Sequence, residues 1–251
     1  MNASPETREH IVKSYDEELK RLTGEIQRMG EIALAQLDAA IDAVMERDSE
    51  TAMKIAQSDS SIDVLEQEVS HDVVRLLALR QPMARDLREV VAALKIASDL
   101  ERICDYAANV AKRSIALAQS PPIQPVHALP RMAQLALLLV KDVIDAYVER
   151  DPDKALDVWN RDEELDEMYS SLFREFLTYM MEDPRNIGVY THLLFMAKNI
   201  ERIGDHATNI AEDLYYLIFG RALDAARPKG DKSSLELVAS DRPTERGPGE
   251  L

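Results

Sequence analysis

Two short segments of the chain carry the same set of side chains that can bind metal. ERICDYAAN begins at Glu101 and ERIGDHATN begins at Glu201, and each places a Glu, an Asp and an Asn at four-residue intervals. On a helix these positions share one face, where like charges four residues apart repel by roughly a few tenths of a kcal/mol. A cation between the carboxylates would remove that repulsion. The two segments therefore indicate a pair of cation sites.

A second pair of acids precedes each segment: Asp59 and Asp63 in the first case, Asp162 and Asp166 in the second. If each pair lies on a helix beside the Glu–Asp–Asn row, four carboxylates and an amide converge. Carboxylates four apart lie about 6 Å from each other, so they can share cations about 3–4 Å apart. Oxygen ligands suit Mg, Mn, Ca or ferric Fe ions, and Zn is compatible with carboxylates. The predicted metal ligands are Asp59, Asp63, Glu101 and Asp105, with Asn109, and Asp162, Asp166, Glu201 and Asp205, with Asn209.

A helical-wheel projection places each row opposite a stripe of core residues. Leu87, Val90, Val91 and Leu94 share the side of the first row, about two to four turns before Glu101. One side of the helix thus changes from apolar residues to oxygen ligands. Since the apolar residues indicate a buried side, the acids on it need a counter-charge. The predicted core stripes are Ala93, Ile96, Leu100, Ile103, Ala107 and Val110, and then Leu193, Met196, Ile200, Ile203, Ala207 and Ile210.

Two simpler interpretations compete with metal binding. A Glu and an Asp four residues apart are common on solvated helix faces. Asp59 and Asp162 would also suit helix N-caps, with Asp63 and Asp166 adding favourable charge to the first turn. The duplication of the rows and their apolar flanks favour the metal interpretation.

Other candidate residues give weaker signals. Glu68 and His71 have the spacing of one ligand pair of a di-iron bundle, but such a site needs two pairs, and the second repeat has no counterpart. His206 adjoins an acid, but the first copy has a tyrosine there, so a structural or accessory role is expected. Cys104 replaces Gly204 and predicts close helix packing. The sequence contains no P-loop, no GxSxG motif, no Cys/His cluster and no nucleophile paired with a base.

The composition suits helices packed by aliphatic residues. Hydrophobic residues make up 46% and aromatic residues 5%, which does not favour a β-sandwich. A formal net charge of -16 repels nucleic acid and anionic lipid and gives no general attraction for free phosphate. Such a surface favours cations or partners with basic patches.

The cellular location is predicted from cysteine content and hydropathy. With one cysteine the chain cannot form an intrachain disulfide, and a reducing cytoplasm is the simplest interpretation. The N-terminal segment lacks the apolar region of a signal peptide. LALLLV at 135–140 is far shorter than the roughly 18 residues that span a bilayer. We therefore expect a soluble cytoplasmic protein without membrane insertion.

The helical pattern is punctuated by proline and glycine. It predicts helices over about 7–47, 50–80 and 82–118, and again over about 130–150, 152–182 and 185–219. AVMERDSETAMKIAQSDSSIDVLEQ from Ala43 aligns without a gap with AYVERDPDKALDVWNRDEELDEMYS from Ala146. We therefore predict an all-α protein of two duplicated three-helix bundles, 1–120 and 131–220. A proline-rich linker (121–130) joins the bundles, and a disordered tail (221–251) follows them.

DLERICDYAANVAKRS and NIERIGDHATNIAEDL, in tandem three-helix repeats, closely resemble the PhoU family of accessory proteins of phosphate-specific transport. The resemblance covers about residues 7–220 and includes the DxxxD pairs. It implies a cytoplasmic regulator that links the ATPase subunit of the phosphate ABC transporter to a phosphate-sensing membrane histidine kinase. When phosphate is plentiful, such proteins hold the kinase in its inhibitory state and restrain uptake. The resemblance also implies a homodimer and metal ions bound through the acidic rows at the ten positions given above.

Three hypotheses follow. The first is a metal-binding helical adaptor that represses phosphate signalling and is not an enzyme. The second is a carboxylate-bridged metal oxidase or hydrolase, which the missing second ExxH and the lack of a base disfavour. The third is a metal-free scaffold whose acids are only solvated helix faces.

Overall fold

The protein is all-α, as its sequence predicts. The computed structural model describes residues 5–57, 60–120 and 128–224, and within these ranges it has seven α-helices and one 3₁₀ turn. Most of the predicted linker and of the predicted disordered tail lies outside the described residues. The elements are α1 (Pro5–Glu46), α2 (Ser49–Gln57), α3 (Ser60–Arg80), α4 (Arg85–Ala118), α5 (Ala128–Glu149), α6 (Pro152–Glu182), η1 (Pro184–Asn186) and α7 (Ile187–Phe219).

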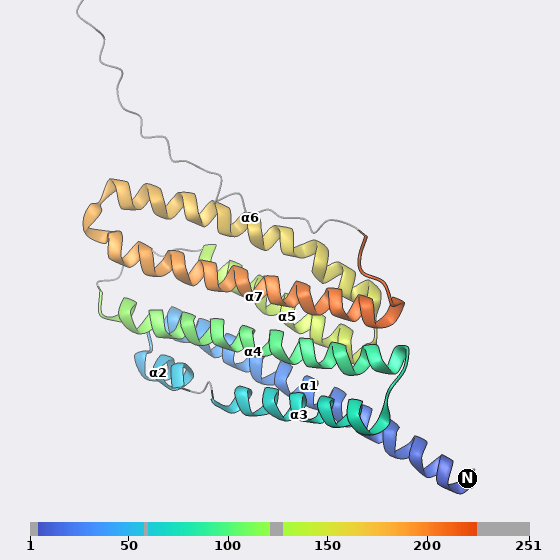
Figure 1. The fold of residues 1–251 in the computed structure, drawn as a ribbon. Helices are drawn as coiled ribbons and strands as arrows, with labels where there is room; N and C mark the ends of the chain where they lie inside the picture. Colours follow the sequence, from blue (N-terminus) through green and yellow to red (C-terminus); the bar gives the residue numbers. More distant parts are fainter. Residues whose placement is uncertain (1–4, 58–59, 121–127, 225–251) are drawn as a thin grey trace, which may run out of the picture.

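The helices form two bundles that share one extended core (Figure 1). The first bundle contains α1, α2, α3 and α4, and the second contains α5, α6 and α7. The helices α6, α7, α4 and α3 lie side by side in that order, with α5 and α1 packed behind them. The pairs α3–α4 and α6–α7 are therefore neighbours, which is the arrangement that the acidic rows require.

The duplication is visible in the backbone just before α2 in the first bundle and just before α6 in the second. Arg47 and Arg150 both take left-handed backbone conformations, with φ of 56° and 58°. Asp48 and Asp151 follow them and cap the next helix in the same way. In each copy, Oδ1 accepts from the backbone N–H groups two and three residues further on, at 2.9 and 3.1 Å. The same turn thus starts α6, which carries the second DxxxD pair, and α2, which precedes the first pair in the sequence.

The prediction of one helix over 50–80 was wrong. In the structure α2 ends at Gln57 and α3 begins at Ser60, whereas α6 runs without a break through the equivalent positions. The first copy reads Ser-Asp-Ser-Ser from Ser58, and the second reads Arg-Asp-Glu-Glu from Arg161. Serine and aspartate side chains compete for backbone hydrogen bonds, whereas Arg and Glu favour helix. One repeat therefore has a helix boundary where the other has a continuous helix.

Helix α1 is unbroken despite two internal glycines, and one of these has a packing role. A Cβ atom at Gly30 would lie 2.4 Å from Cδ1 of Ile144 on α5, so the lack of a side chain lets the two bundles approach closely. A Cβ at Gly24 would meet nothing within 4 Å. The glycine at position 30 therefore belongs to the contact between the two rear helices.

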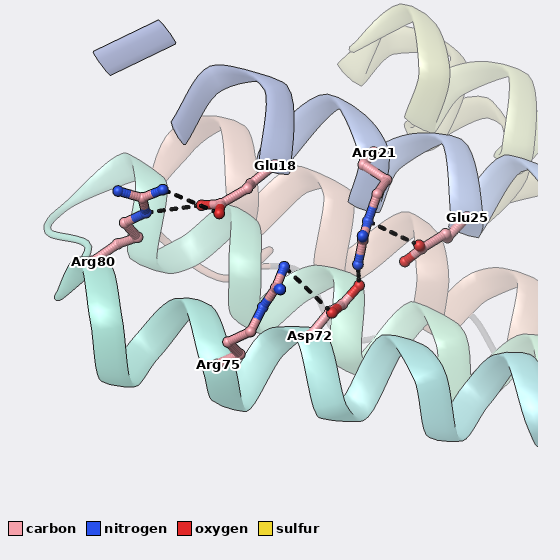
Figure 2. A network of polar contacts seen from close by, with 6 residues as sticks. All are labelled: Glu18, Arg21, Glu25, Asp72, Arg75 and Arg80. Carbon is pink, nitrogen blue, oxygen red and sulfur yellow. Dashed lines mark hydrogen bonds and ion pairs between the residues drawn. The ribbon is translucent and has the colours of Figure 1, made fainter. Parts of the chain in front are cut away.

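A network of ion pairs holds α3 against α1 (Figure 2). Arg80 of α3 donates to Glu18 of α1 through Nε at 2.9 Å and through a terminal nitrogen at 3.1 Å. This hydrogen bonding lowers the pKa of Glu18. Arg21 of α1 joins Glu25 on its own helix to Asp72 of α3. These contacts fix α3 against α1.

The two bundles meet chiefly along α4 and α7, which run antiparallel. Lys95 Nζ lies 2.7 Å from Asp213 Oδ1 near one end of the contact. Near the other end, the Arg113 guanidinium lies 4.2 Å from the centre of the Phe195 ring. Between them, Asp99 accepts a hydrogen bond from an amide of α7. The two acidic rows therefore lie on adjacent, oppositely directed helices.

Among the helices that the structure describes, none has the length and hydropathy of a membrane-spanning segment.

Candidate metal centre

The second DxxxD pair and the two acids of the second Glu–Asp–Asn row lie together at the packed interface between α6 and α7, and we use the name second groove for this interface. A Cβ atom at Gly204, between the two acids of the α7 row, would lie 2.8 Å from Oδ1 of Asp162 on α6. Asp166 of α6 and Asp205 of α7 both act electrostatically on Glu201. The structure thus brings the four predicted carboxylates Asp162, Asp166, Glu201 and Asp205 to one interface.

The acids of the second groove are unusually buried. Asp162 is 1% exposed, and Asp166 and Glu201 are each 5% exposed. Glu201 Oε2 is buried and has no hydrogen-bond partner among the described residues. A buried carboxylate oxygen without a partner is costly unless a ligand satisfies it. Burial raises the pKa of Glu201 to about 7, a hydrogen bond from Lys198 opposes the shift, and the charge of Asp205 adds to it.

These residues fit the expected metal. The donor set is made of carboxylate oxygens, which suit hard cations such as Mg²⁺, Mn²⁺ or ferric iron. A cation would satisfy the buried Oε2 of Glu201 and compensate the concentrated negative charge. Asp162, Asp166, Glu201 and Asp205 are the residues that would hold it.

The first acidic row lies on α4, which packs against α3; we use the name first groove for this interface, and its acids are less enclosed. Glu101 and Asp105 side chains are 20% and 28% exposed. Arg102 pairs with both, at 3.3 Å to Glu101 and 2.9 Å to Asp105. Asp63 is half-buried in the first turn of α3, and Asp59 lies outside the described residues. Glu101 and Asp105 therefore have an exposed arginine as their counter-charge.

The two predicted asparagine ligands are half-buried. Asn209 donates through Nδ2 to Asp99 Oδ1 of α4 at 3.3 Å, so its amide is directed towards the contact between the bundles. Asn109 lies at the equivalent position on α4. His206 Nδ1 lies 2.6 Å from the same Asp99 oxygen, and its ring lies 5.6 Å from that of Tyr106. The expected structural role of His206 is thus a link between the two bundles.

The helix-cap alternative is wrong for the second pair. Asp162 and Asp166 lie well inside α6, whose N-cap is Asp151. Asp63 does lie in the first turn of α3, so its charge also favours the N-terminus of that helix. Asp162 and Asp166 lie in the interior of α6, so a favourable interaction with the helix N-terminus does not explain them.

Position 104/204 is the point where the two copies differ in packing. Cys104 is fully buried, and its backbone carbonyl accepts from Gln36 Nε2 at 3.1 Å. A Cβ at Gly204 would lie 2.3 Å from Cδ2 of Leu165, so α7 approaches α6 too closely for any side chain there. The prediction of close packing at this position is confirmed. The packing is tighter at Gly204, where no side chain fits, than at Cys104, where the cysteine side chain is accommodated.

The isolated Glu68–His71 pair lies elsewhere. Both side chains are exposed on α3, beside a hollow that Arg21 and Asp72 also line. Throughout the ranges 5–57, 60–120 and 128–224, no three His, Cys, Asp or Glu side chains are already arranged as ligands around one point. Arg102 and Lys198 instead hold individual carboxylates of the two grooves.

Sequence reasoning missed Lys198 and Asp99. Lys198 Nζ lies 2.8 Å from Glu201 Oε1, one helical turn before it. Its spacing of three residues from an acid was a readable signal for an ion pair. Asp99 joins His206 and Asn209 across the bundles, and no periodicity within one helix predicts such a contact.

Comparison with known proteins agrees with this architecture. The model of the PhoU domain matches residues 26–114 and again 129–214, which together include both acidic rows. A Xylella fastidiosa protein named phosphate-specific transport system accessory protein PhoU homolog is 56% identical over 225 residues, 90% of this chain and 95% of that protein. A Caulobacter vibrioides protein of the same name is 50% identical over 89% of this chain and 97% of its own length.

Solved structures of PhoU proteins have a similar fold. The crystal structure of PhoU from Pseudomonas aeruginosa superposes with a TM-score of 0.80 at 36% identity, covering 82% of this chain and all of the other. The phosphate transport system regulatory protein PhoU from Streptococcus pneumoniae gives a TM-score of 0.79 at 30% identity, covering 84% of this chain and all of the other. The relatives' names describe accessory and regulatory proteins, which confirms the prediction that this chain is not an enzyme. With two PhoU domains in tandem, the chain belongs to the PhoU family.

Proposed function

We propose that this protein is a negative regulator of phosphate uptake and of the phosphate-starvation response. The observation that carries the proposal is similarity along nearly the whole chain to accessory proteins of phosphate-specific transport, at about half of all positions. The protein acts as a cytoplasmic homodimeric adaptor between the ATPase subunit of the phosphate ABC transporter and a phosphate-sensing histidine kinase. When phosphate is plentiful, it keeps the kinase in its inhibitory state and restrains uptake.

The charge of the molecule supports an adaptor rather than a phosphate receptor. A net charge of -16 gives no general attraction for free phosphate, and the sequence has no phosphate-binding loop. Phosphate status would therefore reach the protein through contact with the transporter. The same charge disfavours nucleic acid and anionic membranes as partners. The long helices α3, α4, α6 and α7, which lie side by side, offer extended surfaces for protein docking.

We further propose that the two grooves hold hard metal ions, which are part of the regulator's folded form. Support comes from the buried acids of the second groove and the unsatisfied Oε2 of Glu201. When bound, the ion would neutralise the carboxylates and join α6 to α7. A metal-free scaffold is the competing possibility, and the metal content of the protein decides between the two.

Deleting the gene is expected to make alkaline phosphatase expression constitutive in phosphate-rich medium. Without the adaptor, the kinase loses the contact that keeps it inhibitory, so the starvation genes stay on. Phosphatase activity in deletion and wild-type cells, grown with excess phosphate, measures this directly. A plasmid copy of the gene should restore repression, which controls for effects on neighbouring genes. Continued repression in the deletion strain would contradict the proposed regulatory role.

A further inference from the structure

Lys198 reaches across the second groove from α7 to α6. Its Nζ lies 2.8 Å from Glu201 Oε1 on α7 and 4.7 Å from the centre of the Tyr169 ring on α6. The Glu201 side chain is 6% exposed, whereas that of Lys198 is 33% exposed. The ammonium group therefore contacts a buried carboxylate and an aromatic ring, and it is also partly exposed to water.

Three further acids lie near the pair that Lys198 forms with Glu201. Asp166 and Asp205 both act on Glu201, and Asp162 lies against α7 at Gly204. One oxygen of Glu201 is taken by Lys198, and the other, Oε2, is buried without a hydrogen-bond partner. The pairing thus compensates part of the buried charge and leaves an oxygen for a further cation.

The first repeat lacks this arrangement. The position equivalent to Lys198 is Ser98, and the position equivalent to Tyr169 is Glu66. The first row instead uses Arg102, an exposed residue on its own helix, to pair with Glu101 and Asp105. The lysine and its aromatic platform are therefore a property of the second groove and not of the duplicated fold.

We propose that Lys198 is a built-in counter-cation that a metal ion displaces from the second groove. This inference rests on the proposed metal binding and states how it is regulated at one of the two grooves. Without metal, the ammonium group neutralises Glu201 and keeps the α6–α7 interface closed. When a metal ion takes the carboxylates, the flexible lysine stem swings towards water, which its partial exposure allows without unfolding. The lysine therefore lowers the apparent metal affinity of this groove.

Mn²⁺ titration of the full-length protein tests the exchange. The first row is neutralised by Glu101→Gln and Asp105→Asn, so that the isotherm reports the second groove. In that background Lys198→Met is expected to raise Mn²⁺ affinity roughly tenfold or more, because the tethered competitor is gone. The methionine keeps the apolar contact with Tyr169. Arg202→Met is the matched control, since Arg202 is exposed beside Glu201 and stacks on Tyr106 instead.

The control separates exchange from a general change in charge. At about 0.15 M salt, Arg202→Met should change affinity by less than about twofold, because exposed charges are screened. Equal gains in both variants, or no gain in Lys198→Met, would overturn the proposal while leaving metal binding intact. Absence of Mn²⁺ binding in the parent and in both variants would instead overturn the exchange and the proposed metal sites together.

A second measurement needs no substitution. Limited acetylation of the wild-type chain, quantified by peptide mass spectrometry, reports how available each lysine amine is. Saturating Mn²⁺ is expected to increase labelling of Lys198 severalfold, because the amine leaves Glu201. Lys95, which pairs with Asp213 away from the groove, should not change. Unchanged or reduced labelling of Lys198 in the metal-loaded protein would overturn the exchange even if the methionine variant fails to fold.

Discussion

Replacing Asp162 and Asp166 together by asparagine is expected to lower the affinity of the second groove for Mn²⁺ by roughly a hundredfold or more. The two side chains are the α6 half of the proposed ligand set and are almost fully buried. Asparagine has nearly the same shape but removes both charges and one anionic oxygen donor from each residue. The fold should persist, because the change relieves repulsion in the metal-free groove.

Mn²⁺ titration of the full-length protein, with the first row neutralised, measures this loss. Glu163→Gln with Glu167→Gln is the matched control, since both residues are exposed on the same helix. That variant also removes two negative charges from α6 but leaves the groove intact, so its affinity should stay near the parent value. If the two double variants lose affinity equally, the metal responds to overall charge and the assigned ligands are wrong.

Glu201→Gln is expected to make the metal-free protein more stable above neutral pH. Burial raises the pKa of Glu201 from 4.5 to about 7, the hydrogen bond from Lys198 lowers it, and the charges of Asp205 and Asp166 raise it further. The folded chain therefore holds a proton that the unfolded chain has released between these pH values. The stability from this group is fully present below about pH 4.5 and is lost as the pH rises through about 7.

The upward shift in the pKa of Glu201 sets the size of this stability difference, on the order of 3 kcal/mol. Part of this will be offset because Lys198 loses its partner, so we expect Glu201→Gln to gain about 1–3 kcal/mol over wild type at pH 8. At pH 5 the two proteins should differ little. Denaturant unfolding of chelator-treated proteins at both pH values measures this. Glu164→Gln, on an exposed face of α6, controls for the loss of a surface charge. An equal stability difference at pH 5 and pH 8 would contradict the burial of an ionised Glu201.

The sequence predicted which helices pair, and it predicted the core face of the two helices that carry the acidic rows. All twelve residues of the two predicted core stripes are buried, as the wheel required. Duplication was the strongest signal, because two copies with the same order of segments imply two similar bundles. From this it followed that the DxxxD pairs and the Glu–Asp–Asn rows would meet, and in the second groove they do.

Other features depend on contacts that no local pattern contains. The antiparallel packing of α4 on α7 brings Asp99 to His206 and Asn209, residues that lie more than a hundred positions away. The reach of Lys198 over Tyr169 depends on how α6 and α7 are spaced, which Gly204 sets. The boundary between α2 and α3 was missed because the hydrophobic spacing continues across it, although the Ser-Asp-Ser-Ser run was a readable signal.

The metal content of the protein tests metal binding in the two grooves most directly. Full-length protein is loaded with Mn²⁺, desalted and measured by elemental analysis. It is compared with a variant in which both rows are neutralised by Glu101→Gln, Asp105→Asn, Glu201→Gln and Asp205→Asn. The wild type is expected to retain at least about one ion per groove, and the variant is expected to retain none. Wild-type protein that retains no metal, or a variant that retains as much as the wild type, would contradict metal binding in the two grooves and favour a metal-free scaffold.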